Sequence, residues 1–105
     1  MKWLGESIRD LRIIHDLQQK EFAKRIGVSR TYLCQIEQGY KRPSFPLLMQ
    51  MSNSFGIPIH DFMILAVEKI SIVKVEGLPE SIQLILKIRE YRRNIRKKEA
   101  GDDSS

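Results

Sequence analysis

The first 66 residues alternate short amphipathic segments with turn residues, and their apolar side chains recur at the three- and four-residue spacing of helices. Five short helices are predicted here. The first spans 2–15 and ends at Asp16, and the second spans 19–25 and ends at Gly27, which can take the left-handed backbone of a tight turn. The residues expected to face inward are Leu4, Ile8, Leu11 and Ile14 in the first helix and Phe22, Ala23 and Ile26 in the second.

The next three helices are delimited by serine caps and prolines. Ser29 is expected to cap a third helix that runs to Gln38, because its hydroxyl can accept from backbone N–H groups one turn further on. Ser44 is expected to cap a fourth helix with Pro46 in its first turn, and Pro58 opens a fifth. The residues expected to face inward are Leu33 and Ile36, then Phe45, Leu48, Met51 and Phe55, then Ile59, Phe62, Met63 and Ala66.

The last 40 residues follow a different pattern. The β-branched run at 70–75 fits a short strand or an extension of the fifth helix, and extended structure is favoured. A long helix is predicted from 81 to about 100, with Pro79 in its first position, before an acidic tail expected to be disordered. The predicted organisation is a domain over 1–68, an extension over 69–100 and a tail over 101–105.

Length and charge narrow the class of function. A chain of 105 residues supports one domain with a modest core, and a net charge of +5 favours an anionic partner. The absence of a long apolar run and of a secretory leader predicts an intracellular protein without a membrane span. The single Cys34 and the isolated His15 and His60 offer no metal-ligand pattern, and the sequence contains no phosphate loop or activated nucleophile. No enzyme, metal or cofactor is expected.

The third predicted helix has one polar face. Ala23 lets the second helix approach closely, Gly27 makes the turn, and Leu33 with Ile36 anchors the third helix, so its other face must point outward. That face has no carboxylate and no large apolar residue. It consists of Arg30, Thr31, Cys34, Gln35 and Gln38.

Three segments together resemble the helix-turn-helix domains of the phage repressor and Cro type, also called the XRE type. They are LGESIRDLR (4–12), QQKEFAKRIGVSRTYLCQIEQGYKRPS (18–44) and SNSFGIPIHDF (52–62). The resemblance covers about residues 4–65 and implies a mainly all-α chain with a five-helix, lambda-repressor-like domain. It also implies a sequence-specific transcriptional regulator that binds double-stranded DNA, in a bacterial or phage-encoded, cytoplasmic setting.

In such a domain the helix 29–38 would enter a major groove. Base contacts are then expected from Arg30, Thr31, Cys34 and Gln35, with Arg30 suited to guanine and Gln35 to adenine. The alternative for each is a solvated side chain that touches no base. Phosphate contacts are expected from Gln19, Ser29, Gln38, Tyr40, Lys41 and Arg42, although Tyr40 could simply cover its loop.

Four more positions matter in this comparison. Arg12 and Glu37 match positions that form an internal ion pair in the family, and both lie at the border of the inward face. Asp16 stands where glycine or asparagine usually ends the first helix, so it must take a left-handed conformation or the turn must differ. Gln18 replaces the usual serine or threonine cap, so the cap of the second helix should be weaker or supplied by Asp16.

The final helix carries an apolar seam at spacings of four, three and four, which suits one partner helix. It consists of Leu84, Ile88, Tyr91 and Ile95. A symmetric homodimer that represses from a palindromic operator is favoured, because two half-sites need two linked reading helices. The alternative is an antitoxin-like protein whose extension binds another protein and folds with it, with DNA binding only for autoregulation.

Two charged features of the chain are open to simpler interpretations. The run 87–98 carries seven basic residues against Glu90, and it is either a solvated helix flank, an extra contact to DNA or a site for an acidic partner. Glu6 and Asp10, one turn apart on the first helix, are interpreted as an exposed flank.

Overall fold

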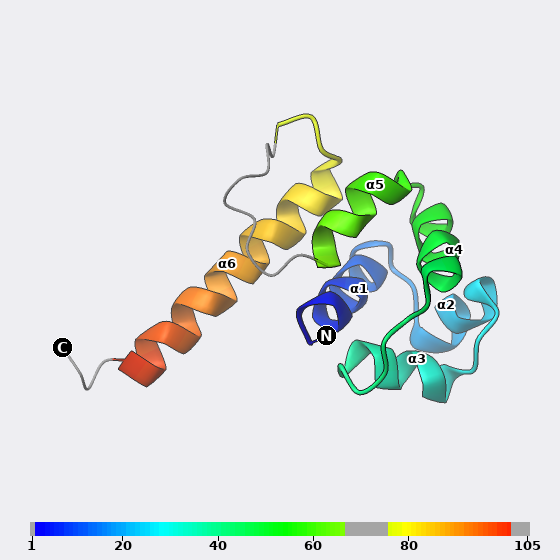
Figure 1. Cartoon of the computed structure of the whole chain (residues 1–105), viewed down its shortest axis with the longest axis horizontal. Helices are drawn as coiled ribbons and strands as arrows, with labels where there is room; N and C mark the ends of the chain where they lie inside the picture. Colours follow the sequence, from blue (N-terminus) through cyan, green and yellow to red (C-terminus); the bar gives the residue numbers. More distant parts are fainter. Residues whose placement is uncertain (1, 67–75, 102–105) are drawn as a thin grey trace.

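The computed structural model describes residues 2–66 and 76–101, which form six α-helices and one 3-10 helix (Figure 1). They are α1 (Lys2–Ile14), α2 (Gln19–Ile26), α3 (Arg30–Glu37), α4 (Phe45–Phe55), α5 (Ile59–Phe62), η1 (Met63–Ala66) and α6 (Glu80–Gly101). Within the described residues the chain is all-α, as predicted. The short strand expected at 70–75 falls outside them.

The turns around α2 follow from the residues at the helix ends. Asp16 has a φ of 56°, so of the two alternatives open for the end of α1 it takes the left-handed conformation. Gln18 makes no side-chain capping hydrogen bond to α2, in agreement with the weaker cap expected there. Gly27 has a φ of 76°, and Ser29 Oγ accepts from the backbone N of Tyr32 at 3.1 Å. A tight turn with a capped exit therefore joins α2 to α3.

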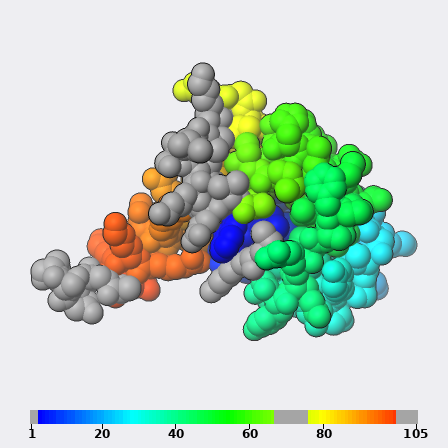
Figure 2. All heavy atoms as spheres, in the orientation of Figure 1, coloured from blue at the N-terminus to red at the C-terminus, as the bar shows by residue number. Residues whose placement is uncertain are grey.

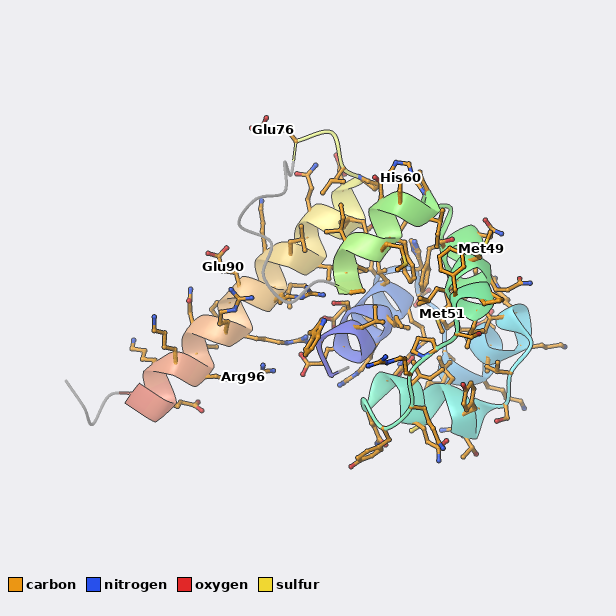
Figure 3. All side chains as sticks on the ribbon, viewed as in Figure 1. Met49, Met51, His60, Glu76, Glu90 and Arg96 are labelled. Carbon is orange, nitrogen blue, oxygen red and sulfur yellow. The ribbon has the colours of Figure 1, made fainter. Side chains whose placement is uncertain are left out.

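One buried cluster connects all the helices. Near its centre the ring centroids of Phe22 and Phe55 lie 4.8 Å apart and those of Phe55 and Phe62 6.2 Å apart. Met51 is fully buried while Met49 on the same helix is 43% exposed, and Figure 3 shows them on different sides of α4. Most of the predicted inward-facing residues belong to this cluster.

Two residues predicted to face inward, Phe45 and Ile14, are exposed, so these two predictions are wrong. Phe45 is 55% exposed, because it is the first residue of α4 and lies roughly 90° around the helix from the centre of the buried stripe. Leu47 is buried in its place. Ile14 is 40% exposed, because α1 ends at this residue and the buried position after the turn is taken by Leu17.

α6 projects from the body along α1, as Figures 1 and 2 show. Its first turns contribute Ile82 and Ile85, at 0% and 1% exposure, to the same buried cluster as the other helices. The helix begins at Glu80, one residue before the predicted start at 81 and one residue after Pro79, which was expected in its first position. Pro79 lies just before it, and its carbonyl accepts from the backbone N of Gln83 at 3.0 Å.

Further along, α6 is held to α1 by ion pairs. Arg92 donates from Nη1 and Nη2 to the two carboxylate oxygens of Asp10 at 2.8 and 3.1 Å, and also from Nη1 to Glu6 at 3.2 Å. Arg96 donates to Glu6 at 3.1 Å. The interpretation of Glu6 and Asp10 as an exposed flank is therefore wrong, because their side chains are only 24% and 12% exposed beneath these arginines.

A third arginine lies between the apolar and ionic parts of this contact. Arg89 Nη2 donates to Ser7 Oγ at 2.6 Å and to the carbonyl of Leu65 at 2.7 Å. Burial, followed by repulsion from Arg93, lowers the pKa of Arg89, whereas hydrogen bonding to Asp10 raises the pKa of Arg92. Three of the seven basic residues in 87–98 thus bind the chain's own α1 side of the body.

Candidate nucleic-acid interface

α3 lies at the lower edge of the helical body in Figure 1, with α1 and α2 above it, and it contacts both helices. Leu33 and Ile36 fix its inner side, at 0% and 1% exposure. On the other side Arg30, Thr31 and Gln38 are exposed, and Cys34 and Gln35 are half-buried. The structure therefore brings the predicted base-contact residues together on one solvent-facing surface.

A close contact between α1 and α3 sets the position of this surface. A Cβ built on Gly5 would overlap the carbonyl oxygen of Ile36 and lie 2.8 Å from that of Glu37. Any larger residue at position 5 would push the two helices apart. Gly5 lies in the segment on which the family resemblance rests, but no pattern in the sequence alone indicates why a glycine stands there.

A buried ion pair reinforces the same contact. Arg12 Nε donates to Glu37 Oε2 at 2.8 Å, and Arg12 Nη2 donates to Glu37 Oε1 at 3.2 Å. The two side chains are 11% and 2% exposed. Arg12 Nη1 also donates to the carbonyl of Leu17 at 2.7 Å, so one guanidinium joins α1, the following turn and α3.

Gln19, the first residue of α2, connects this ion pair to the outer surface. Its Nε2 donates to Glu37 Oε1 at 2.9 Å, and its Oε1 lies 3.5 Å from Arg30 Nε. The side-chain amide of Gln19 is therefore engaged by Glu37 and Arg30 in this structure. The backbone at the start of α2 remains the part of Gln19 best placed for an anion.

Glu37 is the only carboxylate of α3, and its charge is directed inward to Arg12 and Gln19. The outward face of the helix consequently has no negative charge to repel a phosphate backbone. Lys41 and Arg42 follow in the loop and are exposed, and Tyr40 beside them is 78% exposed. Ser29, at the start of α3, is exposed too, although its hydroxyl caps the helix.

The predicted dimerisation residues lie on α6, away from α3. Leu84, Tyr91 and Ile95 are 46%, 67% and 36% exposed, and Ile88 is half-buried. Among the residues that sequence reasoning missed, Glu6 and Asp10 hold α6 in place. The sequence held one indication of this contact. Glu6 and Asp10 lie one turn apart on one helix, and arginines lie at a similar spacing on another.

The fold and this polar, carboxylate-free helix face define a helix-turn-helix DNA-binding protein. The family described as Helix-turn-helix (HTH_3) matches residues 8–62, and the chain belongs to this XRE-type family of DNA-binding transcriptional regulators. The resemblance noted from the sequence is thereby confirmed, and the protein is a regulator by family and not an enzyme.

Two relatives and one solved structure illustrate the similarity. The chain is 40% identical over 61 residues to the uncharacterized HTH-type transcriptional regulator MJ0272 of Methanocaldococcus jannaschii, covering 58% of this chain and 92% of that protein. It is 37% identical over 76 residues to the ImmF control region 10 kDa protein of Bacillus phage phi105, covering 72% and 81%. The clp gene regulator ClgR of Corynebacterium glutamicum has the same fold, with a TM-score of 0.59 at 23% identity over 94% of this chain and 90% of that one.

The described residues give two further findings. None of the helices in 2–66 and 76–101 has the length and apolar content needed to cross a membrane. In the same ranges no three His, Cys, Asp or Glu side chains are grouped as a metal site would require.

Proposed function

We propose that this regulator is a repressor that binds a palindromic operator as a homodimer, with α3 of each subunit in a major groove. The observation that supports it best is the outer face of α3, which is solvent-facing, free of carboxylate and rigidly backed by Gly5 and the Arg12–Glu37 pair. A preformed polar surface of this kind can meet base edges without a free-energy cost for rearranging the helix.

Within this proposal the outward face of α3 reads the sequence. Arg30 is exposed and can donate two hydrogen bonds to guanine O6 and N7, while Gln35 can bond adenine N6 and N7. The methyl group of Thr31 can contact the methyl group of a thymine. Cys34 is half-buried between these residues and would pack beside the bases.

The surrounding residues would position α3 without reading sequence. Lys41 and Arg42 supply positive charge just beyond α3, and Gln38 and Tyr40 supply polar groups beside them. Ser29 and the backbone of Gln19 lie at the starts of α3 and α2, where helix dipoles favour a phosphate.

The homodimer is supported by the apolar seam of α6, of which Leu84, Tyr91 and Ile95 remain exposed after α6 has docked on α1. Exposed apolar residues that follow a helical repeat are typical of an association surface. α6 forms and docks within a single chain, which favours this proposal over the antitoxin-like alternative, since that alternative expects the extension to fold with another protein.

Selection of bound duplexes from a randomised pool, followed by footprinting, tests the proposal. We expect a palindrome whose half-sites lie about one helical turn, roughly 10 base pairs, or a multiple of it apart. Expression from a promoter overlapping that site should fall when the protein is present. An asymmetric single half-site would contradict the homodimer, an increase in expression would contradict repression, and failure to bind any duplex at low salt would contradict the proposal as a whole.

A further inference from the structure

α6 has two apolar faces, and only one of them is buried. Ile82 and Ile85 are fully buried in the core, whereas Leu84 and Tyr91 are 46% and 67% exposed. At 3.6 residues per turn the two faces lie about 120° apart around the helix. Docking of α6 on the body therefore leaves its second apolar face available to another helix.

The second face has the repeat of a two-helix coiled coil. Its four residues, Leu84, Ile88, Tyr91 and Ile95, occupy successive d, a, d and a positions of a heptad. The spacing of four, three and four reads the same from either end, so it permits parallel or antiparallel pairing. The choice between the two must come from the charges.

Charge is distributed unevenly along this segment. Residues 76–86 carry Glu76 and Glu80 and no basic residue, whereas residues 87–98 carry seven basic residues and one acidic residue. A parallel pair would bring the two basic halves together and would place Lys98, the next d position, against its own copy. An antiparallel pair would place the basic end of each helix, 93–98, beside the acidic start of the other helix and would oppose the two helix dipoles, whereas the middle part 87–92 faces its own copy in either orientation.

We propose that two copies of this chain associate through α6 in antiparallel orientation. Leu84 packs against the partner's Ile95, Ile88 packs against the partner's Tyr91, and Glu80 lies near the partner's Lys98. The inference rests on the proposed homodimer and specifies how its subunits meet. Arg96 is on the α1 side of α6, engaged with Glu6, so the pairing leaves the contact between α6 and α1 intact (Figure 3).

Disulfide cross-linking tests the orientation. Leu84→Cys and Ile95→Cys are made as separate proteins in a Cys34→Ser background, which alone should form no cross-link. In the antiparallel pair, residue 84 meets the partner's residue 95, while two copies of residue 84 lie about 16 Å apart along the helix. That separation exceeds the reach of a disulfide. We expect cross-linked dimer on oxidation of the mixed proteins and none from either protein alone.

The other outcomes separate this inference from the proposed function. Cross-links within each separate protein would show parallel pairing, and a dimer by light scattering without any cross-link would show a different interface. Either result overturns the antiparallel inference and leaves the homodimer in place. A chain that stays monomeric at tens of micromolar and occupies its DNA site as one copy overturns both.

A charge exchange tests the same orientation without cysteine. Glu80→Lys or Lys98→Glu should each weaken dimerisation by about two- to fivefold, and the double variant should restore it. Glu90→Lys makes the same charge change as Glu80→Lys at a c position of the heptad, outside the seam, and serves as the control. Failure of the double variant to recover affinity would contradict the antiparallel register.

Discussion

At the scale of single residues, a series of contacts runs from the core to the proposed DNA-reading surface. The Arg12–Glu37 pair is buried, Gln19 hydrogen-bonds to Glu37, and Arg30 Nε lies 3.5 Å from Gln19 Oε1. The last contact is long and therefore weak, so Arg30 can exchange it for a base at little cost. The inner contacts, from Arg12 and Gln19 to Glu37, are short and hold α3 in place.

Arg30 is predicted to determine base preference. Arg30→Ala should lower the discrimination between the selected operator and a site changed at its guanine by about 1–3 kcal/mol. Arg30→Lys keeps the charge but loses the planar pair of donors, so it should retain more affinity than alanine and still lose the preference. Dissociation constants on the two duplexes measure this. An unchanged preference in both variants would exclude Arg30 as a reading residue.

Arg12 is predicted to stabilise the fold. Arg12→Ala would leave the carboxylate of Glu37, which is 2% exposed, without its cation. The free energy of unfolding should fall by about 3–5 kcal/mol, as measured by chemical denaturation. Arg9→Ala removes an exposed arginine from the same helix and should change the free energy by no more than about 0.5 kcal/mol. Equal effects of the two substitutions would contradict this role.

At the scale of elements, α1 is the helix on which the arrangement depends. Gly5 and Arg12 fix α3 on one side of it, and Asp10 and Glu6 fix α6 on another. The contact with α6 combines buried apolar residues at one end with partly exposed ion pairs further along. The ionic part should therefore respond to salt, while the apolar part should not.

Arg92 is predicted to support the docking of α6. Arg92→Ala should lower the free energy of unfolding by about 1 kcal/mol at low salt, because the guanidinium is partly exposed, and by less at 1 M salt, where screening is strong. Lys97→Ala, a cation on the opposite side of α6, is the control and should have little effect in either condition. A decrease that is equal at both salt concentrations would indicate that packing, and not charge, accounts for the contribution of Arg92.

The sequence predicted the elements well and their mutual contacts less well. Asp16, Gly27, Ser29 and Ser44 act locally, through their own backbone or the next turn, so their positions could be predicted. The exposure of Phe45 depends on which side of α4 meets the core, which periodicity at a helix start does not determine. The roles of Glu6 and Asp10 depend on a helix more than 80 residues away in the chain.

The same distinction applies to the candidate site. The outward face of α3 was predicted because the inner residues Leu33 and Ile36 define its opposite. The inward engagement of Gln19 could not be predicted, because it requires Glu37 to be placed within reach of α2 by the turn. Local patterns thus indicate which surface faces solvent, and tertiary contacts decide which polar groups on it are already occupied.

At the scale of the whole molecule, the reading helix and the proposed dimer surface belong to one connected body. Ile82 and Ile85 of α6 share a buried cluster with Leu33 and Ile36 of α3, and α1 contacts both helices. The orientation of α3 relative to the α6 seam is therefore set within each subunit. The spacing of half-sites in the operator should follow from this fixed geometry together with the way the two α6 helices pair.

The salt dependence of binding is predicted to report how many copies occupy one site. Affinity falls as salt rises, and removing one cation that neutralises a phosphate reduces the magnitude of the slope of log affinity against log salt by about 0.9. Lys41→Ala should therefore reduce the magnitude of this slope by about one if a single copy binds and by about two if a homodimer binds. Measuring affinity for the selected operator between 50 and 200 mM salt, roughly the range over which such slopes are well determined, distinguishes these values.

Lys97→Ala is the matched control, because it removes the same charge from α6 and leaves the α3 region unchanged. If the basic run 87–98 is a solvated flank, this variant keeps the slope of the original protein, since net charge alone releases no counterion from DNA. If the run contacts flanking DNA, the magnitude of the slope falls for Lys97→Ala as well. Should Lys41→Ala leave the slope unchanged while Lys97→Ala lowers it, the DNA would lie along α6 and the proposed placement of α3 in the groove would be wrong.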